Sequence, residues 1–102
     1  NEIPDDGKYP YDIAFAEWKG ISMGEKVTVI IKGDTIQIVY DGDGHLTNAK
    51  KGDILNSGII RKHKSGVWII AQSEEDIYLN EIGGCTDGPS VIDFEQMKYW
   101  LC

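Results

Sequence analysis

The sequence predicts an all-β fold, an antiparallel meander of about seven to eight strands that closes, or nearly closes, into a small barrel. Three observations support this prediction. Runs of β-branched residues recur along the chain, Gly-Asp and Asp-Gly turns separate them, and apolar residues alternate with polar ones inside them. The clearest pair is 26–32 (KVTVIIK) and 35–41 (TIQIVYD), joined by Gly33-Asp34. Two such runs joined by a tight polar turn are typical of a β-hairpin.

The chain has 102 residues, which indicates one domain spanning 1–102. Residues 1–10 hold two prolines, a glycine and three acids, and we expect them to form a loosely held arm. No apolar run approaches the roughly 20 residues that a membrane-spanning helix needs, so we expect no transmembrane segment.

The next elements follow from the same alternation. Residues 11–18 alternate at period two and predict the first strand, with a short helix as the competing interpretation. Residues 53–63 predict a long strand, in which Gly58 indicates a bulge or a sharp bend. Residues 67–72 are apolar on both faces, which is typical of a central strand covered on both sides.

The last third of the chain is harder to interpret. Residues 76–82 predict a strand. Residues 91–102 are ambiguous, because they are rich in strand-forming residues while three of their apolar residues have helical spacing (Phe94, Met97 and Leu101). We favour a strand over this range, bulged near Glu95-Gln96.

The chain is acidic, with a formal net charge of -7. Nucleic-acid binding requires Lys and Arg for phosphate contacts, so we expect no nucleic-acid partner. The range 65–97 contains no Lys, Arg or His. Its acids could attract a basic protein partner, and the candidate contacts are Glu74, Glu75, Asp76 and Glu81.

Two cysteines, Cys85 and Cys102, are the only ones in the chain. Their spacing suits neither a zinc site, which needs two more ligands, nor a CxxC redox motif. We expect a disulfide between them, with two unrelated thiols as the alternative. Such a bridge predicts an oxidising, extracytoplasmic compartment: secreted, periplasmic or envelope-anchored.

The sequence contains no complete motif for catalysis, metal binding or cofactor binding. The string DGDGH at 41–45 resembles part of a calcium loop, but that loop would need Gly where Leu46 lies and Glu where Gly52 lies. No GxSxG, HExxH, GxGxxG or Walker pattern occurs. His63 lies next to a predicted turn, and we expect it to be solvated. Ser57, Ser65 and Ser73 lie at turns or in mid-strand, which gives no support for a catalytic serine. We therefore predict no enzyme activity, no cofactor and no metal.

Aromatic residues supply the candidate ligand contacts. The chain has three Trp and five Tyr, and most lie in predicted strands. Buried aromatics usually build a core, but in a barrel they can also line a pocket for an apolar or sugar-like ligand. We select Tyr40, Trp68 and Tyr78, which would act by stacking or apolar contact.

The order of these features resembles the small lipocalin or calycin type of barrel. The resemblance rests on EWKG at 17–20, KGDTIQIVYDG at 32–42, KGD at 51–53 and SGVWII at 65–70, together with the late cysteines. In that family Gly precedes Trp, whereas here Gly20 follows Trp18. The resemblance implies non-catalytic binding, and either secretion or an envelope location with a lipid anchor upstream of Asn1.

These inferences predict a secreted or envelope-associated binding module for a small apolar or sugar-like ligand. The alternative is an acidic protein-interaction or inhibitor domain that recognises a basic protein.

Overall fold

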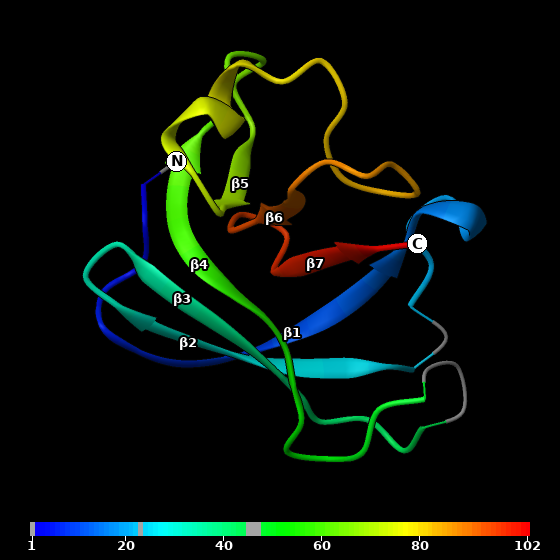
Figure 1. Cartoon of the computed structure of the whole chain (residues 1–102). Coiled ribbons are helices and arrows are strands. Elements are labelled where there is room, and N and C mark those ends of the chain that lie inside the picture. Colours follow the sequence, from blue (N-terminus) through cyan, green and yellow to red (C-terminus); the bar gives the residue numbers. More distant parts are fainter. Residues whose placement is uncertain (1, 23, 45–47) are drawn as a thin grey trace.

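The structure of the chain is a computed structural model that describes residues 2–22, 24–44 and 48–102. Over these residues it is a closed barrel of seven strands in the order β1-β2-β3-β4-β5-β6-β7, with two short 3-10 helices (Figure 1). The predicted all-β barrel is confirmed. The elements are β1 (Gly7–Phe15), η1 (Ala16–Trp18), β2 (Lys26–Lys32), β3 (Thr35–Tyr40), β4 (Ile54–Lys62), β5 (Trp68–Ala71), η2 (Glu74–Tyr78), β6 (Ser90–Asp93) and β7 (Lys98–Leu101).

The barrel closes through a parallel pair between its first and last strands. Every other neighbouring pair is antiparallel. Because seven strands that alternate in direction must begin and end pointing the same way, closure requires β1 and β7 to run parallel. Their register extends from Asp12 opposite Lys98 to Phe15 opposite Leu101. The predicted meander is therefore antiparallel everywhere except at this seam.

β1 begins at Gly7, so the N-terminal arm is shorter than the predicted 1–10. The first half of β1 pairs with β2, and pairing with β7 begins only at Asp12. Pro10 is tolerated there because a proline nitrogen needs no ladder partner at an open strand edge. Asp6 anchors the chain just before the strand, since its carboxylate accepts a hydrogen bond of 2.7 Å from the backbone N–H of Gly33.

β2 and β3 form the hairpin that the sequence predicts. Lys32 lies opposite Thr35, and Gly33 occupies the turn with a φ of +61°. A positive φ at this position favours glycine, because a Cβ would crowd the backbone. Alternate residues of β2 are buried, which puts Val27, Val29 and Ile31 on the inner face of the barrel.

β4 is long and follows a continuous curve in Figure 1, and Gly58 lies within its residue range. A Cβ on Gly58 would lie 2.6 Å from the backbone oxygen of Ala71 in the neighbouring strand. The register with β3 also shifts between Ile38 and Val39, as at a β-bulge. The ladder is regular at Gly58, which lies opposite Ile36, so the bulge of this strand lies at Leu55 and not at the predicted Gly58.

The strand predicted over 76–82 is wrong. A 3-10 helix, η2, covers its first part instead. Ser73 and Asp76 form a reciprocal capping box at the start of η2. The Asp76 carboxylate also accepts a hydrogen bond of 2.7 Å from the backbone N–H of Gln72. These local bonds satisfy the backbone as the chain leaves β5, and they favour a helical turn over extension.

The single bulged strand predicted over 91–102 is also wrong, although its strand character is confirmed. The range forms most of two strands, β6 and β7, which pair through Ile92 with Tyr99 and Asp93 with Lys98. The turn between them is fixed by Asp93, whose Oδ1 accepts hydrogen bonds of 2.9 Å from the backbone N–H groups of Glu95 and Gln96. Met97 completes the turn with a φ of +55°.

The inside of the barrel is filled by its own side chains. A single cluster of inward-facing residues forms the core, and Ile13, Val29 and Ile38 at its centre have no exposed surface. Core side chains therefore occupy the inner face of the barrel, as is usual for barrels with few strands. Among the described residues, no helix is long or apolar enough to cross a lipid bilayer.

Candidate functional site

A surface cleft of about 450 Å³ lies over β5, β6 and β7 and is the strongest candidate for a ligand site. Two Trp, one Phe and two acids supply its main chemical groups: Trp68, Phe94, Trp100, Asp93 and Glu95. Ligand sites in proteins typically combine an aromatic or apolar lining with a few polar groups that fix orientation. This cleft has both.

The β6–β7 turn brings these groups together. The Asp93 carboxylate closes the turn, which places Phe94 and Glu95 at its tip. Phe94 then packs against Trp68 of β5, with ring centroids 5.9 Å apart and ring planes at 58°. Tilted aromatic pairs at this separation are favourable. The ring of Trp68 is further covered by Lys62, whose Nζ lies 5.3 Å from the ring centroid.

Trp68 carries the most informative polar atom of the cleft. Its indole Nε1 is buried, and it has no hydrogen-bond partner within the described part of the chain. An indole N–H is only a donor, and buried donors usually find an acceptor. An acceptor beside Nε1 would be stabilised, but because this atom has almost no exposed surface, a ligand in the cleft reaches it only if the groups that cover it move aside.

The other two aromatic candidates lie elsewhere. Tyr40 is 1% exposed and belongs to the core, where its hydroxyl donates a hydrogen bond to the buried carboxylate of Glu25. Tyr78 ends η2 and is 68% exposed. Neither lines the cleft. Of the three predicted contacts, only Trp68 lines the cleft, and Tyr40 and Tyr78 lie away from it.

The four candidate acids are only partly available to a partner. Glu74 pairs with Arg61, whose Nε lies 3.0 Å from its Oε1, and Asp76 caps η2. Glu75 and Glu81 are exposed. Arg61 also donates to Asp34, and this hydrogen bond lowers the pKa of the Asp34 carboxyl. Half of the predicted acidic contacts therefore serve the fold.

Burial and nearby charges raise the pKa of Tyr11, and one of these charges belongs to the cleft residue Asp93. Tyr11 in β1 is 3% exposed, and burial raises its pKa to about 12. The charges of Tyr9 and of Asp93, a cleft residue, add to this rise. Tyr11 is therefore neutral under ordinary conditions and acts as a hydrophobic core residue.

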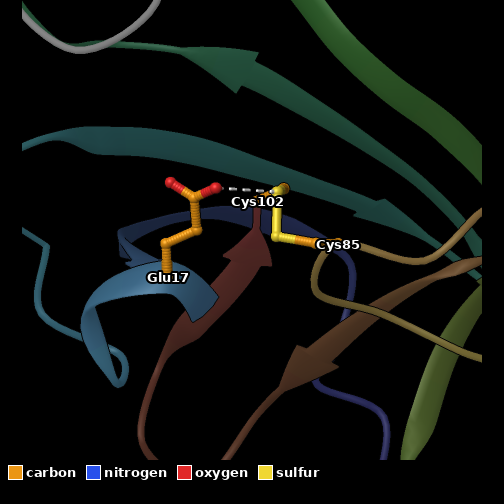
Figure 2. A group of neighbouring side chains, drawn as sticks. All are labelled: Glu17, Cys85 and Cys102. Carbon is orange, nitrogen blue, oxygen red and sulfur yellow. Dashed lines mark hydrogen bonds between the residues drawn. A yellow bond between two sulfur atoms is a disulfide. The ribbon is translucent and has the colours of Figure 1, made fainter.

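The predicted disulfide is confirmed. Cys85 and Cys102 are bridged, with Cα atoms 4.6 Å apart (Figure 2). The bridge ties the loop after η2 to the residue that follows β7. Glu17 of η1 lies beside it, with its Oε1 3.8 Å from Cys102 Sγ. These three residues have potential metal-ligand atoms within 4.8 Å of one another, but sulfurs joined in a disulfide are not thiolates and do not coordinate as such.

Sequence reasoning missed Phe94, Trp100 and Glu95 as cleft residues. They line the same cleft as Trp68 only because the range 91–102 folds into two strands, which the period-two pattern does not reveal. An Asx turn was the available signal, since Asp93 lies just before the polar pair Glu95-Gln96, which separates two runs of strand-forming residues. The string DGDGH at 41–45 extends outside the described residues.

Comparisons with family models, with curated proteins and with solved structures find no match to this chain.

Proposed function

We propose that this protein is a binding module for a small sugar-like ligand, held in the cleft around Trp68. The single observation that carries the proposal is the buried Trp68 Nε1, which lacks an acceptor among the described residues. A hydroxyl-rich ligand would supply that acceptor. A purely hydrocarbon ligand would leave the indole N–H unpaired, at a cost of about 1–3 kcal/mol.

The remaining cleft residues fit the same ligand chemistry. The rings of Trp68, Phe94 and Trp100 offer apolar faces on which the C–H face of a sugar ring can stack. Glu95 is exposed, and its carboxylate can accept hydrogen bonds from ligand hydroxyls. Asp93 offers Oδ2 for the same purpose, because its Oδ1 already serves the turn.

The ligand would be bound on the outside of the barrel. A lipocalin-like protein would be expected to hold its ligand inside, but here the interior is occupied by core side chains. The proposal therefore adopts the binding role that the lipocalin resemblance implies and moves the site to the outer surface over β5, β6 and β7.

The same proposal includes an extracytoplasmic location, either secreted or attached to the cell envelope. The intramolecular disulfide supports this location, because disulfides form and persist in oxidising compartments. Both sulfurs belong to exposed residues, where cytosolic reductants would reach them.

Calorimetric titration with cellobiose, maltose and chitobiose tests the proposal. We expect at least one disaccharide to bind. Trp68→Phe keeps an aromatic ring but removes the Nε1 donor, and it should weaken binding by about 5- to 150-fold, the equivalent of one buried hydrogen bond of about 1–3 kcal/mol.

Trp18→Phe is the matched control. Trp18 lies in η1, is 40% exposed and does not line the cleft, so its loss should leave the affinity unchanged. Equal affinity of the wild type and Trp68→Phe for the bound sugar would contradict the proposal. Failure of all three disaccharides to bind would contradict it as well. Binding of the neutral apolar dye N-phenylnaphthylamine alone would point to an apolar ligand instead.

A further inference from the structure

A histidine and a serine meet at the turn between β4 and β5. His63 follows β4 directly and is 4% exposed, so the prediction that it is solvated is wrong. Its ring Nε2 lies 2.6 Å from the backbone oxygen of Leu79. A carbonyl oxygen can only accept, so this contact requires the proton on Nε2. The neutral ring therefore presents an unprotonated Nδ1.

Ser65 faces this Nδ1. Its hydroxyl oxygen lies 2.8 Å from Nδ1, and its backbone N–H donates to the same atom at 3.1 Å. Because Nδ1 is an acceptor, the Ser65 hydroxyl is the donor. Ser65 itself is exposed, while the histidine beside it is buried. A nucleophile in hydrogen-bond contact with a base, which a third group orients, is the arrangement that activates catalytic serines.

We propose that Ser65 is a reactive nucleophile, with His63 as its general base and the Leu79 carbonyl as the group that orients the base. The ligand class is a small activated ester or a phosphonyl fluoride. Ser65 Oγ would bond to the acyl carbon as the bond from that carbon to the leaving oxygen breaks. The Ser65 proton would pass to Nδ1 and then to the leaving group. The products are an O-acyl serine and the free alcohol or phenol.

The orienting contact is kept when the base takes up the serine proton. Once Nδ1 takes the serine proton, the imidazolium still donates through Nε2 to Leu79. Two further bonds hold the segment that carries Leu79 against this turn. The backbone N–H of Lys64 donates to Ile77 at 2.9 Å, and Lys64 Nζ donates to Asn80 at 2.6 Å. The base is thus fixed before any substrate arrives.

Ser65 directly precedes Gly66, the first of three consecutive cleft-lining residues, but neither Ser65 nor His63 lines the cleft itself. The proposal does not depend on sugar binding, however, since a serine at this turn can react with a small probe whether or not the cleft binds a disaccharide.

Incubation of the folded protein with a fluorophosphonate probe tests the proposal. The Ser65 Oγ–P bond forms as the P–F bond breaks, and hydrogen fluoride leaves. Intact-mass spectrometry should show one adduct, and peptide mapping should place it on Ser65. Ser65→Ala should abolish labelling. Ser73→Ala is the matched control, because Ser73 also lies at a turn but its hydroxyl bonds Asp76.

His63→Gln removes the base but can keep the hydrogen bond to the Leu79 backbone oxygen. The glutamine amide can still donate to the Leu79 oxygen, but it offers no base at the position of Nδ1. We expect labelling to slow on the order of 100-fold, a typical contribution of a general base. The near-ultraviolet dichroism spectrum of this variant should match the wild type, and His63→Asn serves as a second variant if it does not.

Three results would overturn the proposal. The first is no labelling of the folded wild type. The second is an adduct that survives Ser65→Ala, and the third is a folded His63→Gln or His63→Asn variant that labels at the wild-type rate. In each case the contact between His63 and Ser65 would serve only to stabilise the β4–β5 turn. Sugar binding that persists in Ser65→Ala would leave the proposed function standing, so the two proposals can fail separately.

Discussion

Tyr40 donates a hydrogen bond from its hydroxyl to the carboxylate of Glu25, and each of these residues is only 1% exposed. The backbone N–H of Gly44 donates to the same hydroxyl at 2.6 Å. A buried carboxylate needs such donors, because burial without them is costly. Tyr40 therefore holds a charged or polar group inside the barrel, and its role is structural.

Tyr40→Phe should lower the free energy of unfolding by about 1–3 kcal/mol, since it leaves the Glu25 carboxylate without this donor. Urea unfolding followed by fluorescence measures the loss. Tyr78→Phe is the control, because Tyr78 is 68% exposed and its hydroxyl can bond to water. Disaccharide affinity should be unchanged in both variants, and a Tyr40→Phe protein as stable as the wild type would contradict the structural role.

Gly58→Ala should destabilise the barrel by about 1–3 kcal/mol through overpacking. The added Cβ would lie 2.6 Å from the Ala71 oxygen, a backbone atom that cannot move without straining the β4–β5 ladder. Gly7→Ala is the matched control, because its Cβ would meet only the Tyr9 side chain, at 3.4 Å. Gly58→Ala should have a lower melting temperature than Gly7→Ala. Equal melting temperatures would show that a Cβ at position 58 is tolerated in β4.

Reduction of the disulfide should cost about 3 kcal/mol of unfolding free energy in the chain-entropy model, because it opens a loop of 17 residues. The affected segment includes β7, which closes the barrel against β1. Urea unfolding with and without a phosphine reductant measures the change. A Cys85→Ser and Cys102→Ser double variant should have the same free energy of unfolding as the reduced protein, and the reductant should not change it. Unchanged stability on reduction would contradict a role for the bridge at the seam.

The protein should lose stability in alkali as Tyr11 ionises. Burial raises the pKa of Tyr11 in the folded protein to about 12 from its ordinary value of 10.0, so the neutral form is favoured in the fold. The stabilisation is fully present below pH 10 and is lost as the pH rises through about 12. A shift of this size corresponds to about 2–3 kcal/mol. Stability curves of Tyr11→Phe should show a smaller alkaline loss, and identical curves would count against this assignment.

The β2–β3 hairpin and the disulfide were predictable because they depend on local patterns. Alternation in 26–32 and a glycine at position 33 specify a hairpin without information from the rest of the chain. The closing seam was not predictable in the same way. Its parallel direction depends on an odd number of strands, and an eighth strand would have made the seam antiparallel.

The strand count agreed with the prediction for partly incorrect reasons. The sequence placed one strand over 76–82 and one over 91–102, whereas the structure has a 3-10 helix in place of the first and two strands in the second. Side-chain hydrogen bonds decide both cases. Asp76 caps η2, and Asp93 closes the β6–β7 turn. Residue periodicity reports burial of side chains and carries no information about these bonds.

The candidate site was predictable only at Trp68. Its partners in the cleft depend on the β6–β7 turn, and the contact of His63 with Leu79 depends on η2 packing against the β4–β5 turn. Tyr40 was selected for its aromatic ring, but its position on the inner face of β3 puts it in the core. Composition alone does not distinguish an aromatic residue that binds a ligand from one that fills a barrel.

The most direct measurement is an NMR titration of the indole N–H signals with the three disaccharides. The chain has three tryptophans, of which Trp68 and Trp100 line the cleft and Trp18 does not. We predict that the Trp68 signal moves downfield as its N–H gains an acceptor, while the Trp18 signal stays in place. A Trp68 signal that no disaccharide moves, or one that moves together with that of Trp18, would contradict the proposed site.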